Sequence, residues 1–396
     1  STISMQWLTL HELSPTTVQN CIKLMAFMVA FKWFVGFYQG IIIGFENHIW
    51  LNGYKLTFNS LKFIGAFLLI KFITTNILIY FIYQVIIGFL ELLVIQYRIY
   101  RILPKTPFLR PQKAPLKTIA PFALSVAFTS GIWIIYTQLD KLLLSHYIPL
   151  SEYGYFTLVV IISGAIINIS SPLSQSILPR MSNLFSTNNK KELLELYHKS
   201  TQFGATIIIS VTCILANFSF EILVAWTGDT AAATYGSPLL KWYALGNGLL
   251  GITAFQYYLQ YAHGNLKRHV KLNMVFPIIM LPIMFFSIQY YSAIGAAIAW
   301  FGMRLFSFMV VPAYIHHIFA KGHHLTWLKE DIFPGLIVTG LYAVLLNQIN
   351  INFNSFNRLE IFSILFGLGC ILLLLNSIAY NHTRKLILNI LWKLKI

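Results

Sequence analysis

Charged side chains are scarce in this 396-residue chain, because Asp, Glu, Lys and Arg together make up only 10% of it. Soluble globular domains carry about 25% charged residues. Apolar residues reach 57%, and they are gathered into long runs. A soluble core would show apolar stretches of about 10–14 residues, whereas a helix that crosses a bilayer needs about 20. The composition therefore predicts a polytopic membrane protein.

Recognisable catalytic and cofactor-binding motifs are also missing. The sequence has no HExxH, no GxSxG and no Gly-rich phosphate loop. Its three cysteines have spacings that suit neither a metal site nor a disulfide framework. The four histidines of "HHIFAKGHH" lack a nearby Cys or carboxylate ligand, which favours a polar cytoplasmic turn over a metal site. We therefore predict no cofactor, no metal and no enzymatic activity.

The long apolar runs predict eleven transmembrane helices. Each run is too long for a strand of a membrane barrel, which needs about 9–11 alternating residues. The predicted spans are 22–44, 56–73, 77–97, 118–139, 153–176, 203–226, 239–262, 272–290, 293–315, 332–349 and 360–380.

Basic residues set the predicted orientation. Twenty Lys or Arg residues fall in one alternate set of connections, and two, Lys141 and Arg358, fall in the other. Cytoplasmic loops retain Lys and Arg, so the C-terminus is predicted to be cytoplasmic and Ser1 to lie outside. The net charge of +16 follows largely from this topology, so it does not call for a nucleic-acid partner.

Charges inside the predicted spans are the most informative feature, because a charge in hydrocarbon usually faces a bundle interior or a watery cavity. Lys32 and Arg304 lie near the middle of their spans. We expect them to line a cationic cavity, with a structural ion pair as the alternative. Lys62 and Glu91 lie nearer the span ends and could instead reach the headgroups; Glu91 is a candidate for ion coupling.

Polar residues on two further spans extend this picture. Asp140 ends a polar stripe on one face of span 118–139, and Lys141 follows it. They are candidates for substrate binding, and Asp140 also for ion coupling, or else both mark the outer membrane boundary. Gln256 belongs to an unusually polar span, 239–262. Amides suit sugar hydroxyls, although packing between helices explains them equally well.

Four blocks of sequence carry a family resemblance: "GFYQGIIIGFENHIWLN", "YFIYQVIIGFLELLV", "TQLDKLLLSHYIPLSEYGYFTLVV" and "SPLSQSILPRMSNLF". They resemble the Wzx-type O-antigen and polysaccharide flippases of the multidrug/oligosaccharidyl-lipid/polysaccharide exporter superfamily. The similarity extends from about Trp7 to about Trp226.

The resemblance implies an all-α fold with two helical lobes around a central cavity. Chains of this family usually begin with three more helices, so the N-terminal lobe is expected to be incomplete. The expected domains are a partial N-terminal lobe at 1–97, a cytoplasmic linker at 98–117, a six-helix C-terminal lobe at 118–319, and two additional helices with a basic tail at 320–396.

The resemblance also implies a function: movement of undecaprenyl-pyrophosphate-linked oligosaccharide across the bacterial inner membrane by alternating access. Lys32, Lys62, Asp140, Lys141, Gln256 and Arg304 are the expected substrate contacts. Expected partners are this lipid-linked substrate, membrane lipids, and glycan polymerase and chain-length machinery. A cation-coupled multidrug exporter of the same superfamily and a membrane-embedded glycan polymerase or ligase remain as alternatives.

Overall fold

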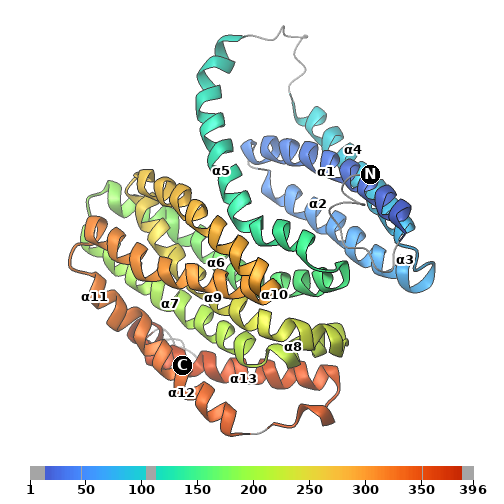
Figure 1. Ribbon diagram of the computed structural model, residues 1–396. Helices are drawn as coiled ribbons and strands as arrows, with labels where there is room; N and C mark the ends of the chain where they lie inside the picture. The colour runs from blue at the N-terminus through green and yellow to red at the C-terminus, as the bar shows by residue number, and fades with distance from the viewer. Residues whose placement is uncertain (1–13, 46, 104–112, 350, 386–396) are drawn as a thin grey trace, which may run out of the picture. The chain divides into compact units, whose positions relative to one another are not determined.

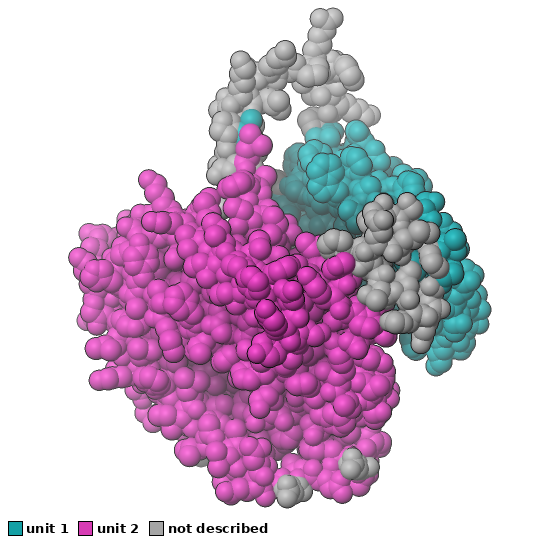
Figure 2. All heavy atoms as spheres, in the orientation of Figure 1, with its two compact units in different colours: residues 1–121 teal, residues 122–396 magenta. Residues whose placement is uncertain are grey.

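The computed structural model describes residues 14–45, 47–103, 113–349 and 351–385. Within them it is built from helices and contains no strand, as predicted (Figure 1). The chain divides into two compact units, residues 1–121 and 122–396, which Figure 2 colours separately. We call them unit 1 and unit 2.

Unit 1 contains helices α1 to α4 and the first residues of α5. Its elements are α1 (Pro15–Gly44), α2 (His48–Ser60), the π-helix η2 (Leu61–Gly65), α3 (Ala66–Phe72) and α4 (Ile77–Ile102). Ser14 caps α1 by accepting from the Thr17 N–H, and Pro15 fits the first turn because it needs no donor there. The small core of the unit contains Ile42, Ile95 and Ile99.

Unit 2 contains the remaining helices, joined by short turns. They are α5 (Lys113–Tyr147), α6 (Leu150–Ser186), α7 (Lys190–Asn217), α8 (Ser219–Thr227), α9 (Thr230–Ala262), α10 (Lys267–Phe319), α11 (His324–Thr326), the π-helix η3 (Trp327–Ile332), α12 (Phe333–Gln348), the 3₁₀ turn η4 (Phe353–Ser355) and α13 (Arg358–Ala379). In Figure 1, α12 and α13 lie along α7, with which both are in contact.

Helix α9 is the centre of unit 2, because α6, α7, α8 and α10 all pack against it. Small residues permit the close approach. A Cβ atom on Gly246 would lie 2.6 Å from Cδ1 of Trp300 on α10. Glycine is typical of such tight helix contacts in membranes. The amides of α9 are therefore surrounded by protein, which explains how this polar helix can exist in an apolar chain.

The predicted spans all fall on helices, and the chain is a multi-pass membrane protein. Seven helices among the described residues are long and apolar enough to cross a membrane. One of them is α10, whose 53 residues cover two predicted spans and are interrupted at Ser292 by a φ of 54° and a ψ of −141°. Helix α9 is not among the seven because of its polar residues, and span 56–73 is divided among α2, η2 and α3.

The ends of the elements differ from the expectation at two places. Span 203–226 is divided at Phe218, where α7 ends and α8 begins. Helix α7 begins at Lys190, 13 residues before the start of the predicted span 203–226. Around the expected linker at 98–117, α4 extends to Ile102 and α5 begins at Lys113, and residues 104–112 lie outside the described residues.

Candidate functional site

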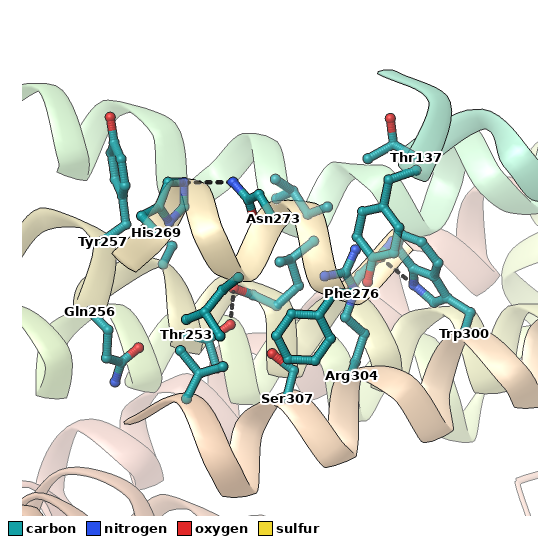
Figure 3. A pocket seen from close by; sticks show the side chains of 18 of the residues that line it. Thr137, Thr253, Gln256, Tyr257, His269, Asn273, Phe276, Trp300, Arg304 and Ser307 are labelled. Carbon is teal, nitrogen blue, oxygen red and sulfur yellow. Dashed lines mark hydrogen bonds between the residues drawn. The ribbon is translucent and has the colours of Figure 1, made fainter. Parts of the chain in front are cut away.

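Unit 2 encloses a pocket of about 1070 Å³ that is lined by side chains from α5, α6, α9 and α10 (Figure 3). Most of its lining surface is apolar, although many of the lining side chains also carry a polar group. Asp140, Lys141, Gln256 and Arg304 line it, so four of the predicted substrate contacts share one cavity. A volume of this size matches the upper range of small-molecule sites.

Arg304 is the buried cation of this pocket, with a relative exposure of 5%. Its guanidinium carbon lies 4.8 Å from the ring centre of Tyr136 and 4.1 Å from that of Trp300. Both rings stabilise the positive charge by cation–π attraction. The Nε and Nη2 atoms, however, have no hydrogen-bond partner. A desolvated guanidinium with unpaired donors is arranged to receive an anion, because carboxylates and phosphates match its fork geometry.

The aromatic rings beside Arg304 are themselves held in place. Trp300 donates its indole N–H to Asn247 Oδ1 at 3.0 Å and stacks on Tyr243. Trp300 precedes Arg304 by four residues, so both project from the same face of α10. The orientation of the cation is thus fixed by α9 as well as by its own helix.

Asp140 is buried next to this aromatic group. Its Oδ2 accepts a hydrogen bond of 2.5 Å from Tyr243, and its Oδ1 accepts one of 2.8 Å from the Lys141 backbone N–H. The Lys141 ammonium, which is partly exposed, lies 3.7 Å from the carboxylate. Only 3% of Asp140 is exposed, so its side chain is surrounded by protein.

Amides and aromatic residues occupy another part of the pocket, where Figure 3 places Gln256, Tyr257, His269 and Asn273 together and apart from Trp300. The rings of Tyr257 and His269 are 4.6 Å apart. His269 Nε2 and Asn273 Nδ2 are joined by a 2.9 Å hydrogen bond. This part can therefore offer polar contacts without a formal charge.

Unit 1 contains the other three predicted site residues. Lys62, on the π-helix η2, forms a salt bridge with Glu91 of α4, and Glu91 is buried. Hydrogen bonds also hold the backbone around this pair. The Tyr54 hydroxyl donates to the Glu91 backbone carbonyl, and the Gln84 amide donates to the Lys62 backbone carbonyl. Lys32 is exposed on α1. Four of the predicted residues thus line the pocket in unit 2, two form an ion pair in unit 1, and Lys32 belongs to neither group.

Sequence reasoning missed several residues of the pocket, among them Trp300, Tyr243, Tyr257, His269 and Asn273. The spacing of Trp300 and Arg304 was an available signal. His316 and His324, of the predicted polar turn, contact each other through their Nδ1 atoms at 3.0 Å. Among the described residues, no group of three or more His, Cys, Asp or Glu could hold a metal ion.

Comparison with known proteins gives matches to a family model and to solved structures. A family model described as polysaccharide biosynthesis protein matches residues 3–185. The solved structure described as lipid II flippase MurJ in an inward closed conformation superposes with a TM-score of 0.72 at 16% identity, covering 92% of this chain and 75% of that one. A search of curated proteins finds no match.

Both matches confirm the resemblance inferred from the sequence blocks, and neither matched protein is described as an enzyme. The structural likeness, at this identity, is one of fold. Over residues 3–185 the chain therefore matches the model of the polysaccharide biosynthesis protein family, and the chain as a whole shares the fold of the solved lipid II flippase structure.

Proposed function

We propose that the chain moves undecaprenyl-pyrophosphate-linked oligosaccharide, a repeat unit of O-antigen or another surface polysaccharide, across the bacterial inner membrane. The observation that carries this proposal is Arg304, a buried guanidinium with unpaired donors at the wall of a large pocket. The pyrophosphate is the one strongly anionic part of such a substrate. Its transfer out of water is unfavourable unless a fixed cation compensates for the lost hydration.

The chemistry of the pocket fits the two other parts of this substrate. Saccharide hydroxyls would contact the amides and aromatic rings of α9 and α10, and the polyprenyl chain would remain in the bilayer. The pocket therefore recognises the headgroup alone. Alternating access of the two lobes would carry that headgroup from the cytoplasmic to the outer leaflet.

The residues of unit 1 have complementary proposed roles. Lys32 and Lys62 would add positive charge along the path of the headgroup. Glu91 and Asp140 are the candidates for ion coupling, because each is a buried carboxylate next to a lysine. The topology proposed from the basic loops places the C-terminus in the cytoplasm and Ser1 in the periplasm. Glycan polymerase and chain-length machinery would then receive the product.

An anion-selective pocket argues against the alternative of an exporter of cationic drugs. Such an exporter would present an unpaired carboxylate, whereas Asp140 is engaged by Tyr243 and Lys141. Arg304, in contrast, keeps two nitrogen atoms without partners. The unpaired groups of the pocket wall therefore favour a negatively charged ligand.

The first test is binding of undecaprenyl pyrophosphate to the purified chain in nanodiscs, measured by thermophoresis. We expect Arg304→Ala to weaken binding at least about tenfold, because a charge-assisted hydrogen bond contributes about 1.5–3 kcal/mol. Arg304→Lys should retain part of the affinity, since it keeps the charge and loses the planar fork. Arg180→Ala, at an exposed arginine of α6, is the matched control. Equal affinity of Arg304→Ala and the wild type would contradict the proposal.

A further inference from the structure

Two glutamine side chains of α9 have acceptor atoms without partners. The Oε1 atoms of Gln256 and Gln260 make no hydrogen bond, although the two residues are only 1% and 2% exposed. Both residues line the pocket. A buried acceptor without a partner is energetically unfavourable. Two of them on adjacent turns of one helix indicate a place where a ligand supplies donors.

The protein fixes which end of each amide remains free. Gln256 donates its Nε2–H to the Tyr197 hydroxyl at 3.2 Å, and Gln260 donates its own to the Gln256 backbone carbonyl at 3.3 Å. The Tyr197 hydroxyl also lies 2.7 Å from His316 Nε2. The Tyr197 hydroxyl is thus held between Gln256 and His316. This chain of hydrogen bonds holds the Gln256 oxygen as the end without a protein partner.

The free oxygens select a kind of ligand. Carbonyl oxygens accept from hydroxyl and N–H donors and repel anionic oxygens, so this part of the pocket is unsuited to a pyrophosphate. The partly buried ring of Tyr257 lies next to Gln256 in sequence and lines the same pocket. An aromatic face beside amide oxygens that accept from hydroxyl groups suits a pyranose, which has both apolar C–H faces and hydroxyl donors.

The distance along α9 separates this place from the cation. Asn247, which holds Trp300 and through it the Arg304 side chain, precedes Gln256 by nine residues, or roughly 14 Å along the helix at 1.5 Å per residue. Figure 3 likewise shows Gln256 and Arg304 at different parts of the pocket. That spacing is comparable to the reach of a pyrophosphate with one or two attached sugars.

We propose that Gln256 and Gln260 form a saccharide subsite that accepts hydrogen bonds from sugar hydroxyls and makes the pocket selective for the glycosylated form of the lipid. The inference rests on the proposed function, because it assigns a role in substrate binding to a second part of the same pocket. Arg304 receives the pyrophosphate, and the two glutamines receive the sugar that follows it. Tyr197 is a positioning residue that acts through Gln256.

The test compares two probes on the purified chain in nanodiscs: undecaprenyl pyrophosphate, and the same lipid carrying one N-acetylglucosamine. We expect the wild type to bind the glycosylated lipid about three- to tenfold more tightly than the bare lipid, because one or two neutral hydrogen bonds contribute a difference of that size. Gln260→Met and Gln256→Met keep the side-chain length and remove the acceptor. In each, the preference for the glycosylated lipid should fall, with binding of the bare lipid unchanged. Gln138→Met, at an exposed glutamine of α5, should leave the preference intact.

The outcomes separate this inference from the proposed function. If the wild type binds both lipids with equal affinity, the subsite is wrong and the anion site stands; this arm needs no variant to fold. If Gln260→Met weakens both lipids equally, the glutamine has a structural role only. If neither lipid binds to the wild type, the proposed function itself fails. Tyr197→Phe should lower the preference and spare bare-lipid binding, because Gln256 would lose the contact that orients it.

Discussion

Two kinds of polar side chain are buried at the pocket of unit 2: one charged guanidinium and two neutral amides. Arg304 is desolvated and stabilised by two rings, whereas Gln256 and Gln260 are desolvated and held by one hydrogen bond each. In all three side chains some polar atoms remain unpaired. Native proteins pair most buried polar groups. Several unpaired polar atoms line this one pocket, and we propose that a ligand pairs with them.

His263, at the turn between α9 and α10, should make the stability of the protein depend on pH. Its ring lies between Phe185 and Phe319, and burial lowers its pKa below the usual 6.5. The neutral form is thus favoured in the folded state, and the unfolded chain takes up a proton first as the pH falls. Stability should therefore decrease from about pH 6.5 downward. When thermal unfolding is measured in detergent between pH 7.5 and 5, His263→Phe should lose less stability than the wild type. Equal losses in the two proteins would show that His263 does not contribute.

At the scale of elements, the helices could be predicted because the bilayer imposes their length. Spans 22–44 and 77–97 lie within single helices for that reason. Breaks within apolar runs could not be predicted in the same way. Nothing in the composition around Phe218 or Leu61 distinguishes a helix end or a π-turn from an uninterrupted helix, since packing against neighbouring helices decides both.

The same reasoning explains what could be predicted of the site. Arg304 and Asp140 were found because charges within apolar runs are unfavourable and therefore informative. Trp300 and Tyr243 were missed because aromatic residues make up 16% of the chain, so a single Trp or Tyr in a span carries little information. Their positions became meaningful only once α9 and α10 were seen to pack against each other.

The break in α10 at Ser292 allows a prediction about the stability of the protein. Ser292 adopts a φ of 54° and a ψ of −141°, a conformation that is strained for any residue except glycine. It is exposed, so its side chain does not anchor the turn by burial. Ser292→Gly should stabilise the protein by about 1 kcal/mol, seen as a higher midpoint of thermal unfolding. Ser292→Val should lower that midpoint. A lower midpoint for Ser292→Gly would mean that the serine makes a contact that outweighs the strain.

At the scale of the whole molecule, each of the two units has its own buried core. Units with separate cores can move as rigid bodies, as alternating access requires. The candidate anion site lies within unit 2 alone, whereas Lys32 and the Lys62–Glu91 pair belong to unit 1. On this account the substrate headgroup first binds a preformed pocket, and the charges of unit 1 act later in the cycle.

We propose that the chain transfers a lipid-linked saccharide between leaflets and that Arg304 is needed for this transfer. The most direct measurement places undecaprenyl pyrophosphate carrying N-acetylglucosamine in one leaflet of proteoliposomes and follows its exposure to an impermeant lectin. We expect transfer by the wild type and by Arg180→Ala, and only the protein-free rate for Arg304→Ala. Transfer by Arg304→Ala at the wild-type rate, or none by the wild type, would contradict it.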